Sequence, residues 1–284
     1  MSSTEMDDGN DGMDDGRKHV KSGLMRESLV SKALMEETDH GEIRRMLPDV
    51  NFIAIGGESI IDRGAEALFP LVDVIAKLAK RYKLVIGASG GIRVWHTYSI
   101  ALDLGIPVGG LAKIMGGIEE QNRDVLQFLL SPHGGISFMK DHFNELPMFL
   151  GAGLIPICVG QPPYHQWEPP PKEGRVPENG PDVGLFLMAE VLGAARMIYV
   201  KDIDGIFLPD SGDGQEAKMV TEVTAKSLLD MDLPDLPIER ELLRCVETSR
   251  LLRECYVING LKPETLERLL EGDQVGTRIT RSQD

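Results

Sequence analysis

The sequence is poor in basic and aromatic residues. Its 284 residues contain 30 Lys and Arg against 45 Asp and Glu, a formal net charge of −15 at pH 7. Such a surface repels nucleic-acid phosphates and anionic lipid headgroups, so neither nucleic acid nor a membrane is expected as a partner. Aromatic residues make up only 5% of the chain, but a hydrophobic content of 42% is ordinary for a globular protein with one large core.

The sequence also lacks the features of a secreted or membrane-anchored protein. The N-terminus MSSTEMDDGNDGMDDG has neither the basic nor the apolar segment of a signal peptide, and no apolar run of about 18 residues follows. Cys158, Cys245 and Cys255 are widely spaced and include no C-x-x-C pair that would suggest zinc or a redox dithiol. We therefore predict buried thiols and a cytoplasmic location.

Composition divides the chain into two parts. Residues 1–47 are acidic and glycine-rich at first and then weakly helical, with few aromatic residues to anchor a core. We predict that they form a flexible N-terminal extension that becomes ordered on a neighbouring subunit, where apolar residues such as Leu24 and Leu34 would be buried. The alternative is a solubilising tail without such contacts. Residues 48–284 are predicted to form one folded domain.

Short apolar runs alternate with helical patterns along this domain. Strands are expected where β-branched runs end in glycine, and helices where apolar residues recur with a helical period. Buried strands flanked by helices predict a three-layer α/β/α sandwich with a mainly parallel central sheet. The expected strands are 50–55, 83–87, 136–139, 154–159, 197–200 and 255–259, and the clearest expected helices are 63–82, 92–104, 111–130 and 183–192.

Two glycine turns follow the first two predicted strands. Gly56 and Gly57 end the first strand, while Gly90 and Gly91 follow the second, with Arg93 close behind. Glycine leaves backbone N–H groups open to an anion, and arginine offers a planar fork for an oxyanion. Because parallel sheets bind ligands at the carboxyl ends of their strands, the two turns together predict one ligand crevice. Either turn alone could equally be a plain tight turn.

Charged residues follow the predicted strand 197–200. Lys201 stands at its carboxyl end, where an ammonium group would meet a phosphate. Asp202 and Asp204 could bind Mg²⁺ or orient the lysine. The other interpretation is a solvated turn with Asp204 and Gly205 at its tip.

A proline-rich segment, residues 160–181, precedes Asp182. Its prolines exclude a helix or a central strand, and a long loop inside a compact domain is usually functional. His165 lies in the rigid sequence PPYH, which could hold an imidazole against a metal or an oxyanion, although a lone loop histidine is more often simply exposed. Asp182 is expected at or near the N-cap of the helix 183–192, and capping alone would explain it.

Together these motifs resemble the amino acid kinase superfamily in order and spacing. Several stretches are similar to the molybdenum storage proteins within it, from about residue 51 to residue 280: DRGAEALFPLVD, HTYSIALDLGIPVGGLA, EEQN, PPYH, FLMAEVLGA, YVKDIDGIF, YVINGL and VGTRIT. The resemblance implies the amino acid kinase fold and a cage-like hexamer that binds ATP with Mg²⁺ and stores molybdate or tungstate as polyoxometalate. Such a hexamer would be a homo-oligomer or a hetero-oligomer with a paralogous subunit.

The same resemblance implies roles for individual residues. Lys201 and Asp182 correspond to a catalytic pair, and His165 corresponds to a histidine that binds an oxometalate cluster in one type of subunit. The residues that would lie at the nucleotide, its magnesium and the neighbouring anion site are Gly56, Gly57, Gly90, Gly91, Arg93, Asp204 and Gly205.

One position departs from the superfamily pattern. The first strand there normally ends in K-x-G-G, and its lysine stabilises the transferred phosphate, whereas this chain has Ala54 at that place. Losing such a cation commonly raises the reaction barrier by about 3 kcal/mol, unless Lys201 or Arg93 substitutes for it. Three functions therefore stay open: oxometalate storage, a small-molecule kinase of the uridylate or acetylglutamate type, and a catalytically impaired nucleotide-binding partner subunit. The sequence does not decide whether ATP is hydrolysed.

Overall fold

The computed structural model describes residues 45–160, 180–209 and 217–282. The predicted extension 1–47 falls almost wholly outside these residues. The same is true of most of the proline-rich segment, including His165.

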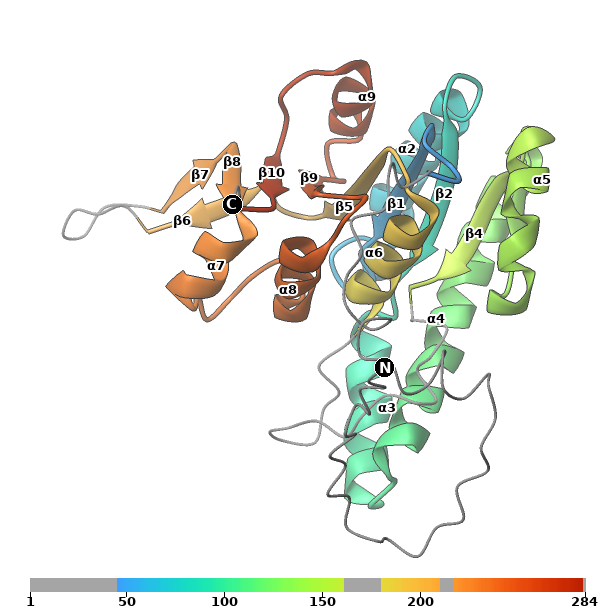
Figure 1. Cartoon of the computed structure of the whole chain (residues 1–284). Helices are drawn as coiled ribbons and strands as arrows, with labels where there is room; N and C mark the ends of the chain where they lie inside the picture. The colour runs from blue at the N-terminus through green and yellow to red at the C-terminus, as the bar shows by residue number, and fades with distance from the viewer. Residues whose placement is uncertain (1–44, 161–179, 210–216, 283–284) are drawn as a thin grey trace, which may run out of the picture. The chain divides into compact units, whose positions relative to one another are not determined.

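An eight-stranded sheet forms the centre of residues 44–284, which make one compact unit (Figure 1). The strand order is β3-β4-β2-β1-β5-β9-β10-β8, and every neighbouring pair is parallel except β9 with β10. Two further strands, β6 and β7, form a separate antiparallel pair. The strands are β1 (Val50–Ile55), β2 (Lys83–Ala88), β3 (Gly135–Ser137), β4 (Ile155–Val159), β5 (Arg196–Lys201), β6 (Ile206–Leu208), β7 (Lys218–Val220), β8 (Glu222–Thr224), β9 (Glu254–Asn259) and β10 (Thr277–Thr280).

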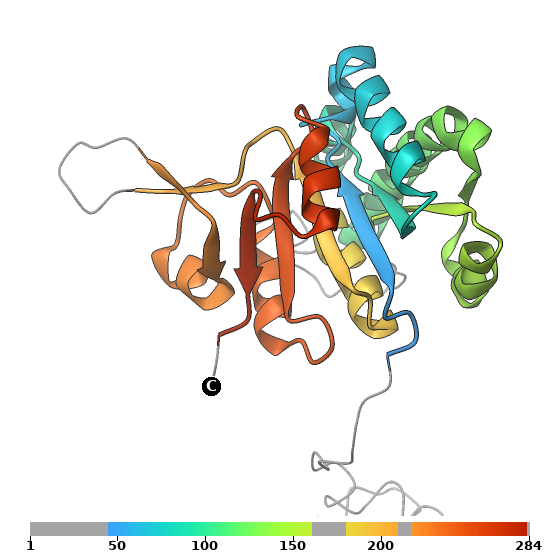
Figure 2. The ribbon, with the colours of Figure 1, turned by 90° about the horizontal axis from the view of Figure 1, so that it is seen from above.

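Alternate residues of each central strand enter two different hydrophobic cores. In β1, Phe52 and Ala54 belong to one core and Ile53 and Ile55 to the other, because successive strand residues point to opposite faces. In Figure 2, α2 (cyan) and α9 (red) lie on one side of the sheet and α6 (yellow) and α8 (orange) on the other. The helices that cover the sheet are α2 (Ala65–Leu78), α4 (Val108–Leu130), α5 (Leu146–Gly151), α6 (Pro181–Leu192), α7 (Ala225–Met231), α8 (Arg240–Thr248) and α9 (Glu264–Glu271).

The predicted three-layer α/β/α fold with a mainly parallel sheet is confirmed, and the differences concern element boundaries and four short strands. The helix expected at 63–82 is interrupted, because Gly64 has a φ of 72° and separates a 3-10 turn, η2 (Ile61–Arg63), from α2. Sequence analysis also missed β6, β7, β8 and β10, whose three or four residues are too few to show a period.

A helical pair lies beyond the carboxyl ends of β1 and β2. Helix α3 (Ile92–Asp103) begins directly after the second glycine turn and packs against α4 through Tyr98, Ala101 and Leu111. The remaining short helices are η3 (Ser131–His133) and η4 (Lys140–Glu145). No helix in the described part of the chain combines the length and apolar character needed to cross a membrane.

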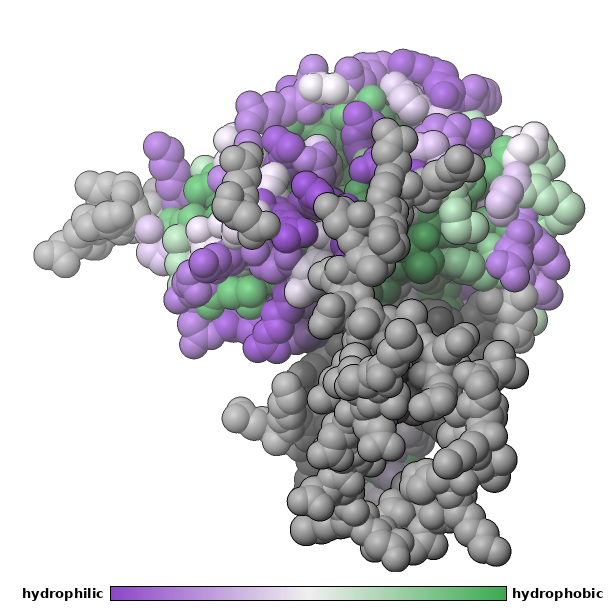
Figure 3. All heavy atoms as spheres, viewed as in Figure 1, coloured by the Kyte–Doolittle hydropathy of each residue, from purple (hydrophilic) through white to green (hydrophobic). Residues whose placement is uncertain are grey.

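Several large hydrophobic side chains are exposed on the surface of this unit. Figure 3 shows hydrophobic side chains gathered over β4 and α5, whereas hydrophilic ones prevail over α8 and the C-terminal strands. Trp95 on α3 and Leu104, directly after it, are exposed, and Phe128 on α4 is 76% exposed. Contiguous exposed apolar surface is typical of regions that contact other proteins.

Candidate functional site

The two predicted glycine turns meet at one pocket. A Cβ atom on Gly57 would lie 2.1 Å from the backbone nitrogen of Gly91, so the turns after β1 and β2 are in direct backbone contact. Beside them opens a pocket of about 350 Å³, which we name the glycine-turn pocket; ligand sites commonly measure about 300 to 1,000 Å³. The ionisable residues that line it are Glu58, Glu119, Asp182, Lys201 and Glu239.

Lys201 and Asp182 form a buried ion pair in this pocket. The lysine Nζ lies 2.8 Å from Oδ2 and 3.1 Å from Oδ1 of the aspartate, and the side chains are only 13% and 4% exposed. Lys201 reaches this place because it ends β5, which pairs with β1 next to the first glycine turn. The Tyr199 hydroxyl donates to the backbone oxygen of Asp182 at 2.8 Å and ties the start of α6 to β5. The structure thus brings the two residues predicted as a catalytic pair together.

The N-terminus of α6 is capped by a residue far away in sequence. The carboxylate of Glu239 accepts hydrogen bonds from the backbone N–H groups of Gly180 at 3.1 Å, Asp182 at 3.2 Å and Val183 at 3.0 Å. Asp182 lies in the first turn of α6, near the N-cap as predicted, but its carboxylate binds Lys201 and does not cap the helix. Burial, and next the Asp182 carboxylate, raise the pKa of Glu239 to about 7.

Removing the Glu239 cap is expected to destabilise the protein. In Glu239→Ala the three N–H groups lose their acceptor, which should lower the free energy of unfolding by about 1 to 3 kcal/mol in urea denaturation. Since the folded-state pKa of about 7 exceeds the ordinary 4.5, the stability due to Glu239 declines as the pH rises from 4.5 through 7, and Glu239→Gln should remove that decline. Glu241→Ala, which breaks only an exposed pair with Arg244, is the control. A Glu239→Ala protein as stable as this control would contradict the capping role.

Glu119 is a pocket residue that sequence analysis missed. It lies on α4, is 1% exposed, and neither carboxylate oxygen has a hydrogen-bond partner among the described residues. Burial, followed by the carboxylates of Glu239 and Asp182, raises the pKa of Glu119 well above its ordinary value. The hydroxyl of Ser89, in the second glycine turn, likewise has no partner in the described part of the chain.

Arg93 supports the second glycine turn from behind. Its guanidinium donates to Gln121 Oε1 at 2.9 Å and to Asn122 Oδ1 on α4. The Asn122 amide in turn donates to the backbone oxygens of Ser89 at 2.7 Å and Gly90 at 2.9 Å. Arg93 is not among the residues that line the pocket, so its predicted contact with an anion stays a prediction.

Asp204 and Gly205 also lie outside the pocket lining. Asp204 accepts hydrogen bonds from Lys262 at 2.7 Å and Asn259 at 2.8 Å, and these bonds, Lys262 first, lower its pKa. A Cβ on Gly205 would lie 2.5 Å from Thr277 Oγ1, so this glycine allows close packing against β10. The structure therefore groups Gly57, Gly90, Gly91, Asp182 and Lys201 in one pocket and leaves Asp204 and Gly205 apart.

Comparison with known proteins identifies the family. The model of the amino acid kinase family matches residues 49–259. The chain belongs to this family. The molybdenum storage protein subunit beta of Azotobacter vinelandii is 37% identical over 259 residues, which cover 91% of this chain and 96% of that protein. The predicted resemblance to the amino acid kinases and the molybdenum storage proteins is confirmed.

Uridylate kinases are more distant relatives. The enzyme of Methanobrevibacter smithii is 22% identical over 237 residues, which cover 80% of this chain and 97% of the enzyme. The crystal structure of uridylate kinase from Archaeoglobus fulgidus superposes with a TM-score of 0.62 at 18% identity, and the match covers 81% of this chain and 99% of that structure. At this identity the superposition shows the amino acid kinase fold alone.

The position expected to carry a lysine in amino acid kinases is a core residue here. Ala54 is 1% exposed and lies between Gly87 of β2 and Tyr199 of β5. It packs with the hydrophobic core on the α6 side of the sheet. Lys201 is the basic residue among those that line the glycine-turn pocket.

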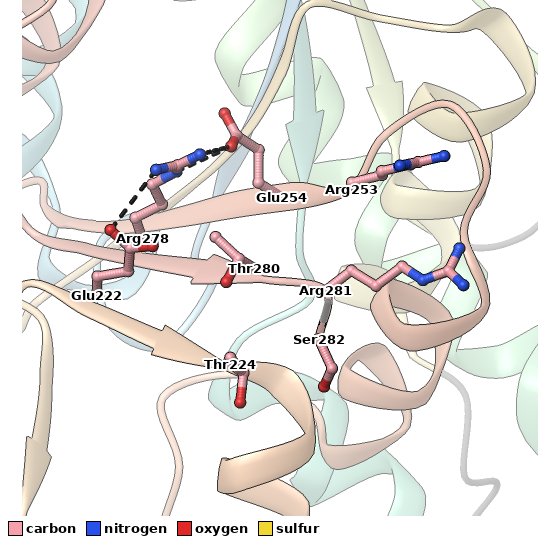
Figure 4. Close-up of a pocket in the computed structure, with 8 residues that line it drawn as sticks. All are labelled: Glu222, Thr224, Arg253, Glu254, Arg278, Thr280, Arg281 and Ser282. Carbon is pink, nitrogen blue, oxygen red and sulfur yellow. Dashed lines mark hydrogen bonds and ion pairs between the residues drawn. The ribbon is translucent and has the colours of Figure 1, made fainter. Parts of the chain in front are cut away.

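A second and larger cavity, of about 790 Å³, lies at β8, β9 and β10 (Figure 4). In it, Arg278 binds Glu254 at 2.5 Å and lies 3.6 Å from Glu222. Its volume exceeds that of the glycine-turn pocket, but it contains neither a glycine turn nor any residue predicted to contact the nucleotide, its magnesium or the oxometalate. We therefore take the glycine-turn pocket as the functional site of this amino acid kinase fold.

Proposed function

We propose that this chain is a subunit of a cytoplasmic oligomer that stores molybdate or tungstate and binds ATP with Mg²⁺ at the glycine-turn pocket. The observation that carries the proposal is the 37% identity, over 91% of the chain, to a protein named as a molybdenum storage subunit. Residues 48–284 provide the fold in this proposal, and residues 1–47 extend to a neighbouring subunit. The three free cysteines fit a reducing compartment.

The glycine-turn pocket fits a phosphate chain. The turns at Gly57 and Gly91 touch through their backbones, so no Cβ stands between their N–H groups and a bound oxyanion. Lys201 would contact phosphate oxygens, and Asp182 would hold its ammonium in place. Mg²⁺, when bound with the nucleotide, supplies positive charge to the phosphates.

The acidic residues of the pocket fit a nucleotide that brings its own cation. No group of three or more His, Cys, Asp or Glu side chains that could hold a metal ion exists among the described residues. Mg²⁺ commonly uses phosphate oxygens and one or two carboxylates as ligands, so such a group is not required. Further parts of this proposal are Arg93, Asp204 and Gly205 as nucleotide or anion contacts and His165 as a ligand of the stored oxometalate.

Assembly into a hexamer, with identical or paralogous subunits, is part of the same proposal. Apolar surface that an oligomer would bury is exposed at Trp95 on α3, at Leu104 directly after this helix and at Phe128 on α4. The name of the Azotobacter relative describes it as one of several subunits, which supports a paralogous partner.

A catalytically impaired partner subunit is a second candidate, favoured by the buried Ala54. A small-molecule kinase is supported by the uridylate kinase relatives, but their sequences are only 22% to 26% identical to this chain. Formation of UDP from UMP and ATP by the purified protein would favour the kinase.

The storage function is tested by loading the purified protein. The full-length protein is incubated with ATP, Mg²⁺ and molybdate or tungstate, and native mass, bound metal and released phosphate are measured together. We expect a large oligomer that retains many Mo or W atoms per subunit, and less retained metal when ATP is omitted. A protein that retains no metal would contradict storage and leave the impaired nucleotide-binding subunit as the better account.

A further inference from the structure

The charges of the glycine-turn pocket do not suit an anion if every group is ionised. Glu58, Glu119, Asp182 and Glu239 line it with four carboxylates, and Lys201 supplies one ammonium that already binds Asp182. A phosphate or molybdate would be repelled by this arrangement. Binding an oxyanion here is therefore favoured when a cation such as Mg²⁺ accompanies it, and also when the pocket itself loses negative charge.

Glu119 is the group best placed to reduce the negative charge of the pocket, by carrying a proton. Its side chain lies against the second glycine turn, since a Cβ built on Gly90 would be 3.4 Å from Glu119 Cγ. It is almost fully buried, it lines the pocket, and both carboxylate oxygens are unsatisfied among the described residues. Ser89 lines the same pocket, and its buried hydroxyl is equally without a partner among the described residues. Buried polar atoms normally have partners, so two such side chains on residues that line one pocket indicate a ligand that supplies them.

We propose that the carboxyl group of Glu119 and the hydroxyl of Ser89 donate hydrogen bonds to oxygen atoms of a tetrahedral oxyanion bound at the two glycine turns. The inference rests on the proposed function and adds two specificity-determining residues to it. The oxyanion is a phosphate group of the nucleotide or a molybdate or tungstate ion, which share the tetrahedral oxygen arrangement. A carboxyl group can donate only while it carries its proton, so the ligand binds together with that proton.

The surroundings of Glu119 keep the proton in place. Asp182 on α6, Glu239 before α8 and Glu120 on its own helix all act on it as negative charges, in addition to its burial. The positive charge of Lys201 on β5 is compensated by the Asp182 carboxylate. On α3, Arg93 binds Asn122, less than one helical turn from Glu119, and thereby holds the glycine turn. The ionised form of Glu119 would be repelled both by these carboxylates and by the bound oxyanion. The affinity of the pocket for anions therefore falls as the pH rises and Glu119 loses its proton.

The test measures binding of ATP, and separately of molybdate alone, by calorimetry between about pH 7 and pH 9. The full-length variants are Glu119→Gln, Glu119→Ala and Ser89→Ala, and Glu120→Gln is the matched control because it removes one charge from the exposed neighbouring position. Glutamine keeps a neutral donor and nearly the same shape. We expect wild-type affinity to fall with rising pH, and the affinity of Glu119→Gln to fall much less, leaving only the part due to ionisation of Glu239. Glu119→Ala and Ser89→Ala should each bind about tenfold more weakly, as expected when one hydrogen bond to a charged ligand is lost.

The outcomes separate this inference from the proposed function. Glu120→Gln removes the weakest of the charges that act on Glu119, so its pH profile should differ far less from the wild-type profile than that of Glu119→Gln does. The ligand whose binding changes in Glu119→Gln, ATP or molybdate, identifies the source of the oxyanion. If Glu119→Gln binds both ligands with the wild-type pH profile, or loses affinity as strongly as Glu119→Ala, the donor role of Glu119 is wrong while nucleotide binding stands. If the wild-type protein binds neither ATP nor molybdate, the proposed function itself fails.

Discussion

Replacing Lys201 with methionine is expected to lower the free energy of unfolding by about 3 to 5 kcal/mol and to abolish measurable nucleotide binding. Methionine matches the length of the lysine stem but leaves the Asp182 carboxylate buried and unpaired, with 4% of its side chain exposed. An uncompensated buried charge costs several kcal/mol, whereas the pair itself contributes little net stability. The loss of binding follows because Lys201 is the basic residue of the pocket lining.

Urea denaturation and ATP calorimetry measure the two effects. Lys262→Met is the matched control, since its partner Asp204 lies in an exposed pair and about 0 to 1 kcal/mol is expected. The double variant Lys201→Met with Asp182→Asn should regain much of the stability but not the binding. If Lys201→Met lost no more stability than Lys262→Met, the pair would not be buried as described.

A Gly57→Ala substitution is expected to push the two glycine turns apart. The new Cβ would lie 2.1 Å from the nitrogen and 2.6 Å from the Cα of Gly91, and backbone atoms cannot move aside as a flexible side chain can. We expect a loss of stability of about 3 kcal/mol and of ligand affinity by about 100-fold, because a displacement of about 1 Å disturbs every contact of the bound oxyanion.

Gly117→Ala provides the comparison for this second prediction. Gly117 lies inside α4 with nothing within 4 Å of its added Cβ, so alanine should leave stability unchanged or raise it by about 0.5 to 1 kcal/mol. Thermal unfolding and ATP binding of both variants distinguish the outcomes. Unaltered binding by Gly57→Ala would show that the contact between the turns is not needed for the site.

Local patterns predicted most of the central sheet. The run Val50–Ile55 is wholly apolar apart from Asn51, and its six buried residues form the β1 strand covered on both faces. A strand of this kind needs no alternation, so composition and the following glycines were enough to locate it. Helix boundaries were predicted less accurately where a single glycine determines them, as Gly64 does at the start of α2.

The helical periodicity of the sequence could have identified part of the pocket. Met115, Glu119, Asn122 and Leu126 recur at intervals of four, three and four residues in α4 and therefore share one face of the helix. Leu126 is buried in the core, so the same face carries Glu119 and Asn122 inward. A polar residue on an apolar stripe is the signal that would have identified Glu119.

The sequence by itself determined the α/β/α fold, the glycine turns and the family, because apolar period and turn residues act over a few neighbours in the chain. The tertiary structure alone decided which charges meet. Glu239 caps α6 from 56 to 59 residues away, and Arg93 binds α4 rather than lining the pocket. Hydrogen bonds and pKa shifts depend on burial and on distances in space, and no local pattern records which side chains the folded chain brings together.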